Sequence, residues 1–431
     1  MLSKLSLVAF FAASVFAPAL LADDQSILDV ARQAPPEIFA DAAIKLVERG
    51  QIPPGQRAGL LEEAFQAAKR AHEPVRLQAI PIAGTNTRAA MQDSAGILGL
   101  DTLSLQSRMV RLMMTVDGAR AIELFQSIEH PALLARPCED PMIADASAYY
   151  ETAGMVAGNR PALLMLALGQ ANSPGELASF AKMLTADKAL PDEDRRMIAG
   201  ALALKMSTAA VDYRSFTMNA EELRAGLEAV APTPQLEEAA RKLATEQMSW
   251  PRCNEEFGNA GAFVEWFNKE FHGTLEPIRE EETWTKKFLG TFRTERYFES
   301  AESKQVSDDF GKLRMTLGRP EWRGALSGFL KELSEWKPAG ENIDAFHQKM
   351  TVLHGLFQLA PAGEDRDAVI ARTIDYLRSS GMEREYPAEW LMQVRSFTNA
   401  ATDRAKLLAA FRGSKDPGLE VFAELDAALP K

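Results

Sequence analysis

The sequence has few of the residues on which cofactor sites and nucleophilic catalysis depend. Its 431 residues include two cysteines and five histidines, and the histidines form no His-Glu-x-x-His pattern. The sequence also contains no Gly-x-Ser-x-Gly turn, no Walker loop and no glycine cluster of the dinucleotide-binding type. His347 and His354 are seven residues apart, which is too far along a helix for one metal ion. We therefore expect no metal and no cofactor.

Long hydrophobic runs are absent beyond the N-terminus. Lys4 precedes an apolar run that extends to Ala22, and Asp23 follows it. A basic start, a short apolar stretch and small residues before a polar segment are typical of a secretory signal peptide. We expect residues 1–22 to be this signal, and the mature chain to be periplasmic or secreted without an integral membrane segment. The alternative is an uncleaved membrane anchor. No Asn-x-Ser/Thr acceptor is present, which favours bacterial export.

Positive charge is in the minority. The chain has 48 Lys and Arg residues against 60 Asp and Glu residues, and its formal net charge is −12. Such a balance argues against nucleic acid and anionic membrane surfaces as partners, because like charges repel. A protein or peptide partner fits better, and the sequence does not indicate an oligomeric state.

The two cysteines, Cys138 and Cys253, lie in similar settings. Each has a proline close before it and acidic residues directly after it. In an oxidising compartment pairing is the default, so we expect a disulfide between them. It would close a loop of about 115 residues, worth roughly 4 to 5 kcal/mol in the chain-entropy model. The alternatives are two free structural thiols, or a catalytic cysteine with His130 as its base.

Strand signals are also scarce, whereas helix patterns fill the chain. Residues 35–50 and 56–71 have apolar side chains at the 3.6-residue period, with prolines before each segment. Two helices joined by a short turn form an αα-hairpin, and the pattern recurs downstream. The sequence therefore predicts an all-α fold, either an irregular, solenoid-like helical repeat or a multi-lobed helical array.

Helix starts can be placed from the capping residues. Asp117 precedes one predicted helix, Ser173 and Glu176 form a capping box for another, and Thr233-Pro234 begins a third. Residues 75–96 show neither the helical period nor the alternation of a strand, and we expect a long loop there.

Three lobes follow from the spacing of these features. We expect an N-terminal lobe at residues 23–135, a middle lobe at 136–253 bracketed by the two cysteines, and a C-terminal, aromatic-rich lobe at 254–431.

Aromatic residues gather between residues 250 and 336, which contain five of the six tryptophans. One interpretation is a thick helical core, and the other is a groove that anchors a partner. On a helix over residues 284–298, Lys286, Arg293 and Tyr297 would share a face away from the core. We therefore predict that these three residues bind a partner.

No stretch of the sequence identifies a family or a reaction. The favoured function is that of an exported, noncatalytic scaffold that binds a protein or peptide. The alternative is an all-α secreted hydrolase or lyase that acts on a polysaccharide through paired carboxylates. Acidic runs such as Glu280–Glu282 are usually solvated helix faces. A pocket with two carboxylates from different helices would favour the alternative.

Overall fold

The structure is a computed structural model. It describes residues 26–79, 87–130, 133, 140, 142–186, 190–208, 222–226, 234–249, 257–276, 297–298, 300–401 and 404–427. The predicted all-α fold is confirmed, because helices make up nearly all the regular structure of these residues. Within the same residues, every helix is too short or too polar to cross a bilayer.

The first half of the chain forms an N-terminal stack of helices, in which most helices pack on a neighbour in the sequence or the next but one. Its members are α2 (Pro36–Glu48), α3 (Pro54–Ala68), α4 (Arg88–Gly96), α5 (Thr102–Met114), α6 (Gly118–Gln126), α7 (Ser147–Ala157), α8 (Pro161–Gln170), α9 (Pro174–Ala186), α10 (Asp192–Thr208), α12 (Pro234–Ser249) and α13 (Phe257–Glu270).

The second half forms a C-terminal stack in the same manner. Its members are α15 (Ala301–Met315), α16 (Trp322–Glu335), α17 (Asn342–Leu359), α18 (Glu364–Ser379), α19 (Met382–Glu385), α20 (Pro387–Asn399), α21 (Arg404–Arg412) and α22 (Pro417–Ala427).

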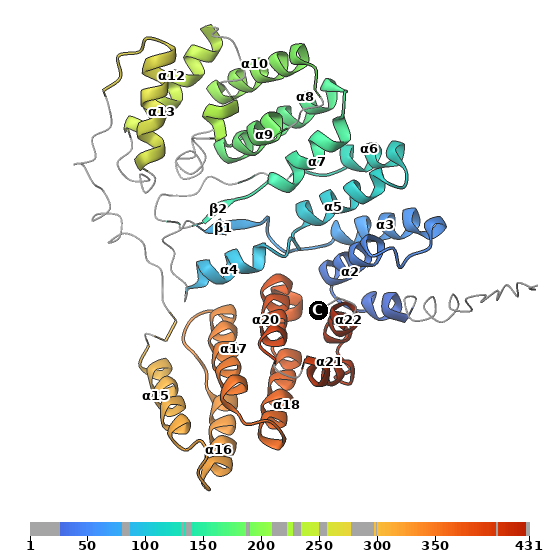
Figure 1. The fold of residues 1–431 in the computed structure, drawn as a ribbon, viewed down its shortest axis with the longest axis vertical. Helices are drawn as coiled ribbons and strands as arrows, with labels where there is room; N and C mark the ends of the chain where they lie inside the picture. Colours follow the sequence, from blue (N-terminus) through green and yellow to red (C-terminus); the bar gives the residue numbers. More distant parts are fainter. Residues whose placement is uncertain are drawn as a thin grey trace, which may run out of the picture.

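The two stacks meet at a junction in the middle of the molecule. Helix α22 packs on α2, and α20 packs on α4. Helices α2 and α22, from opposite ends of the chain, are therefore neighbours, while α13 and α15 lie at opposite ends of the molecule (Figure 1). Polar contacts cross the junction as well: Arg49 Nη1 donates to the Leu425 carbonyl at 2.7 Å. One array of helices thus runs through both halves of the chain.

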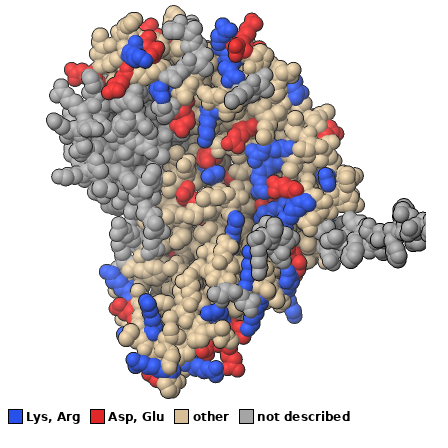
Figure 2. Space-filling model, viewed as in Figure 1, with Lys and Arg blue, Asp and Glu red and all other residues tan. Residues whose placement is uncertain are grey.

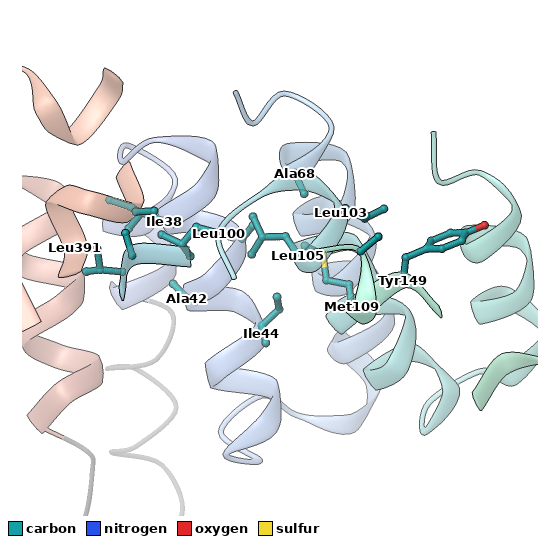
Figure 3. Close-up of a cluster of buried hydrophobic side chains, with 14 of the residues drawn as sticks. Ile38, Ala42, Ile44, Ala68, Leu100, Leu103, Leu105, Met109, Tyr149 and Leu391 are labelled. Atoms are coloured by element: carbon teal, nitrogen blue, oxygen red, sulfur yellow. The ribbon is translucent and has the colours of Figure 1, made fainter. Parts of the chain in front are cut away.

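Apolar burial is continuous across the junction. Ile38 and Ile44 of α2, Leu105 of α5 and Tyr149 of α7 belong to one buried cluster that also contains Leu391 of α20 (Figure 3). Ile44 and Leu105 are fully buried, and truncation of such a side chain to alanine typically costs about 2 to 5 kcal/mol. The stacks are therefore held together by core packing as well as by hydrogen bonds.

The capping predictions are confirmed. Both the Ala119 and Arg120 amides donate to the Asp117 carboxylate at the start of α6. Helix α12 begins at Pro234, and α2 ends just before Gly50, whose φ of 69° is the left-handed conformation that glycine adopts easily.

The prediction of a long loop at residues 75–96 was wrong. This stretch contains the strand β1 (Leu77–Ala79) and the whole of α4. Strand β1 pairs antiparallel with β2 (Met142–Ala144), with Gln78 opposite Ile143. The side chain of Thr87 caps α4 by accepting from the Ala90 amide. Three-residue strands are too short to show an alternating pattern, and this one depends on a distant partner.

Candidate functional site

Four of the predicted site residues lie outside the described residues. These are Cys138, Cys253, Lys286 and Arg293. The disulfide and the basic surface therefore stay predictions.

The fifth, Tyr297, does not lie on an exposed surface, so that expectation was wrong. Its side chain is 7% exposed. Its hydroxyl donates to Asp344 Oδ1 at 3.0 Å and lies 2.8 Å from His347 Nδ1. Residues 297 and 298 form a turn, and the φ of Phe298 is 67°. The helical spacing used in the prediction therefore does not extend to Tyr297, which lies in a turn.

The aromatic residues of this region that the structure describes pack into the core. Trp322 is 4% exposed, and Trp266 and Trp336 are half-buried against the main cluster. Trp266 also meets Phe271 edge-on, with ring centroids 5.6 Å apart. For these residues the core interpretation is confirmed.

Tyr297 belongs to a polar cluster at the junction of the stacks, which we call the junction cluster. Its members are Glu73, Arg88, Tyr297, Asp344, His347 and Glu389, supplied by the loop after α3, by α4, by the turn before α15, by α17 and by α20.

Arg88 joins the two stacks on the outer side of this cluster. Its Nη1 donates to Glu341 Oε2 at 2.6 Å and lies 3.9 Å from Asp344 Oδ2. His347 is fully buried, and its Nε2 has no hydrogen-bond partner. Burial, and then the nearby Arg88 charge, lower the pKa of His347 to about 4. The imidazole is therefore neutral at physiological pH.

Two carboxyl groups face each other on the inner side of the cluster. Burial, followed by the charge of Glu389, raises the pKa of Glu73 to about 8. Burial likewise raises the pKa of Glu389 to about 7, and a hydrogen bond links its side chain to Glu73. Glu73 also accepts from the Ala388 amide at 3.3 Å. Two negative charges on hydrogen-bonded, buried carboxyl groups are unfavourable, so the pair shares a proton near neutral pH.

The pair has the acidity of a general acid or base. Glu73 is half-buried and Glu389 is 4% exposed. The charges of Glu37 and Asp101, both from the N-terminal stack, raise the pKa of Glu73 further. The cavities of about 480, 370 and 110 Å³ found among the described residues are lined by neither Glu73 nor Glu389. The pair is therefore a titrating group within a packed junction.

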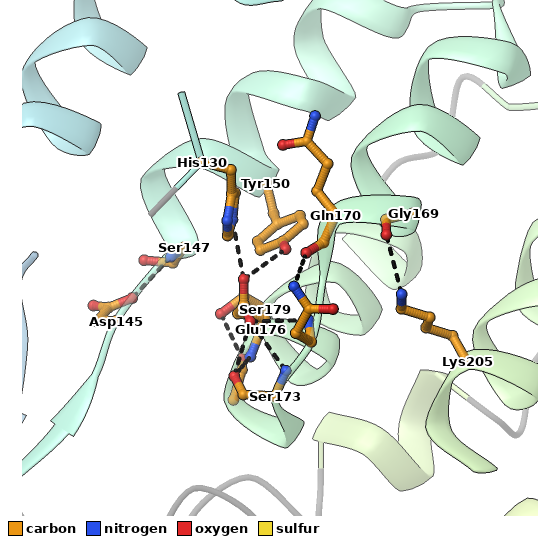
Figure 4. Close-up of polar contacts among 12 residues, drawn as sticks. His130, Asp145, Ser147, Tyr150, Gly169, Gln170, Ser173, Glu176, Ser179 and Lys205 are labelled. Carbon is orange, nitrogen blue, oxygen red and sulfur yellow. Dashed lines mark hydrogen bonds and ion pairs between the residues drawn. The ribbon is translucent and has the colours of Figure 1, made fainter. Parts of the chain in front are cut away.

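A second polar cluster, the Glu176 network, lies inside the N-terminal stack (Figure 4). Glu176 Oε2 accepts from the amides of Asn172 and Ser173, each at 3.0 Å, and from the Ser173 hydroxyl at 3.1 Å. Glu176 Oε1 accepts from the Tyr150 hydroxyl at 3.4 Å and lies 3.0 Å from His130 Nε2.

This network confirms the predicted capping box, because the Glu176 amide also donates to the Ser173 hydroxyl. The His130 side chain is 6% exposed and lies edge-on to Tyr149, with ring centroids 5.0 Å apart. Its Nε2 points at a buried carboxylate (Figure 4). His130 is thus part of the core packing of α7 and α9, which weakens the alternative that made it the base of a catalytic cysteine.

A surface groove lies on the C-terminal stack, between α16 and α18 and over α17. It consists of a larger part of about 480 Å³ and a smaller one of about 110 Å³, which share Arg372 and Asp375. We call it the α16–α18 groove. Its floor is apolar and is formed by Leu326, Leu330, Leu333, Leu353 and Tyr376.

The walls of the groove run in the same direction. Trp322 Nε1 donates to Asp365 at 2.9 Å, and Arg323 Nη1 lies 3.0 Å from Glu364, so both helices begin at one end. At the other end, Lys349 of α17 reaches the Ser334 carbonyl at 3.5 Å. Helix α17 lies beneath and runs the opposite way.

The groove is positively charged in an acidic chain. Arg323, Lys331, Lys349 and Arg372 line it, against Asp365 and Asp375, which leaves a net charge of +2. On the face shown in Figure 2, basic and acidic side chains are mixed, with uncharged surface between them.

The sequence shows no signal for this groove. Its walls are two helices with the buried apolar residues typical of any core-facing helix. Its shape depends on the distance at which α17 holds α16 and α18 apart. A weak signal is present in hindsight, since Ala368 and Ala371 are small, exposed residues next to a basic one, Arg372.

Comparison of the chain with known proteins gives no relative from which a role could be transferred: no protein-family model matches the sequence, and no curated protein is significantly similar to it.

Proposed function

We propose that the chain is an exported, noncatalytic scaffold that binds a protein or peptide segment in the α16–α18 groove. The observation that carries the proposal is the groove itself, a concave apolar floor with basic side chains along its rim. Its larger part falls within the usual size range of ligand sites. Grooves between helices are a common way to bind a peptide segment.

The polysaccharide-cleaving alternative lacks a comparable observation. It requires two carboxylates from different helices in an open cleft, about 5 to 9.5 Å apart and accessible to a sugar. Glu73 and Glu389 do come from distant segments, but they contact each other within the junction. We therefore do not propose an enzymatic activity.

Site-specific photo-crosslinking in the exported protein tests the proposal. A benzophenone amino acid replaces Ser327, an exposed residue that lines the groove. The same amino acid at Glu302, exposed on α15, is the control. We expect one discrete adduct from position 327 that disappears in Arg372→Glu. Identical adducts from both positions, or none from position 327, would contradict the proposed binding surface.

Export and the disulfide are tested together on the same material. We expect intact mass to place the mature N-terminus at Asp23, and non-reducing peptide mapping to yield one linked pair, Cys138 with Cys253. A chain retaining Met1 in the cytoplasm would remove the argument for export. Two alkylatable thiols in exported protein would remove the disulfide alone.

A further inference from the structure

We propose that the segment bound in the α16–α18 groove is an amphipathic α-helix whose apolar face is flanked by acidic residues. This inference rests on the proposed function and specifies the partner by its chemistry. It follows from the shape of the floor, from the charges on the rim and from the state of Lys349.

The floor has the spacing of a helix-binding surface. Leu326, Leu330 and Leu333 stand four and three residues apart on α16, and all three are buried below the groove. A bound helix presents apolar side chains at the same spacing, so its side chains can fit between those of α16. The wall from Arg323 to Ser334 is about 17 Å long, which matches about three helical turns.

The opposite wall allows close approach. Ala368 and Ala371 of α18 are exposed and small, and Ser327 faces them from α16. Without long side chains at these positions, the backbone of a bound segment can lie near the floor. The volume of about 480 Å³ then receives the apolar side chains of one helix face, while the rest of the helix stays outside.

The rim determines the charge of the partner. Arg323 is already paired with Glu364 and Asp365. Lys331 is exposed at the rim, and Arg372 is half-buried where the two parts of the groove meet. Acidic side chains beside the apolar stripe of a partner would pair with both, and basic side chains would be repelled.

Lys349 supports the same charge. Its ammonium lies 5.4 Å from the centre of the Tyr376 ring, in the smaller part of the groove. Burial lowers the pKa of Lys349, which means that its charge is poorly solvated. A carboxylate of the partner would stabilise the Lys349 charge and so replace part of the solvation that burial removes.

Three synthetic helical peptides of 18 residues, each carrying a fluorophore, test the inference by anisotropy on the full chain. The first has a leucine stripe flanked by glutamates, the second has lysines in place of the glutamates, and the third has the composition of the first in scrambled order. We expect the first to bind and the other two to bind more than about tenfold more weakly.

Two matched double variants place the binding. Lys331→Glu with Arg372→Glu should weaken binding of the first peptide by more than about tenfold. Lys304→Glu with Arg314→Glu changes the net charge equally on exposed residues of α15 and should leave binding unchanged. Circular dichroism and thermal melting check that both variants stay folded, including the one that changes the half-buried Arg372.

The outcomes separate this inference from the proposed function. If position 327 crosslinks a partner segment that is basic or uncharged, the binding scaffold stands and the acidic partner is wrong. If the scrambled peptide binds as well as the first peptide, the inferred helical partner is wrong. If both double variants bind the first peptide equally well, its binding site is not this groove. If position 327 gives no adduct, the proposed function itself fails.

Discussion

Two buried glutamates in this molecule have opposite surroundings. Glu176 is 1% exposed, and both of its oxygens accept hydrogen bonds from backbone amides and hydroxyl groups. Glu389 is 4% exposed, its Oε2 lacks a hydrogen-bond partner, and its nearest acidic neighbour is Glu73. Donors stabilise the Glu176 carboxylate, whereas burial raises the pKa of Glu389 and the charge of Glu389 in turn raises the pKa of Glu73.

The difference shows where each group does its work. Glu176 lies within one stack, where it caps α9 and accepts a hydrogen bond from α7, so its network stabilises the packing of these two helices. Glu389 lies between the stacks, where chain segments more than 300 residues apart meet. A fully paired carboxylate makes stability robust, whereas an opposed pair makes it depend on pH.

The largest effect is expected from Glu176→Gln. The amide keeps the shape of the side chain but turns one acceptor into a donor, so buried donors of Ser173 or Tyr150 lose their partner. We expect a loss of about 3 kcal/mol in the free energy of unfolding, measured by urea denaturation. Ser173→Ala removes only the capping hydroxyl and should cost about 1 kcal/mol. Equal losses in the two variants would show that Glu176 acts only as a cap.

A smaller and opposite effect is expected at the junction. The pKa values of Glu73 and Glu389 are raised to about 8 and about 7 in the folded chain, so the fold retains a proton that the unfolded chain loses above about pH 4.5. This contribution to stability is fully present below that pH and is lost as pH rises through 7 and 8. Glu389→Gln cannot ionise, and we expect it to be more stable than the wild type by about 2 kcal/mol at pH 8 and nearly equal at pH 5.

Urea denaturation of both proteins at pH 5 and pH 8 measures this difference. Glu383, whose pKa burial raises to about 7, adds a similar slope to both and cancels in the comparison. If the wild type and Glu389→Gln have the same dependence on pH, the two carboxyl groups do not share a proton.

The same contrast explains what the sequence predicts and what it does not. Helix starts were predicted correctly because caps act over three residues, as in Ser173 with Glu176. The other members of that network, His130 in the loop after α6 and Tyr150 on α7, give no local signal. Glu73 and Glu389 give none either, since nothing in their spacing indicates that they meet. Tyr297 was misplaced for the same reason, because its partners Asp344 and His347 lie on a helix far along the chain.

The smallest effect is expected from removing one hydroxyl group on each side of the comparison. Tyr297→Phe takes away a donor 3.0 Å from Asp344 Oδ1 and the group 2.8 Å from His347 Nδ1. We expect it to cost about 1 kcal/mol, because both partners are buried and His347 already has one unpaired nitrogen. Tyr150→Phe removes a longer bond, of 3.4 Å, to an oxygen that His130 also approaches. We expect a loss of about 0.5 kcal/mol or less there, because a network with several donors tolerates the removal of the weakest. Thermal melts of the two variants at pH 7 decide the point: a larger loss for Tyr150→Phe would mean that the junction cluster is the better satisfied of the two.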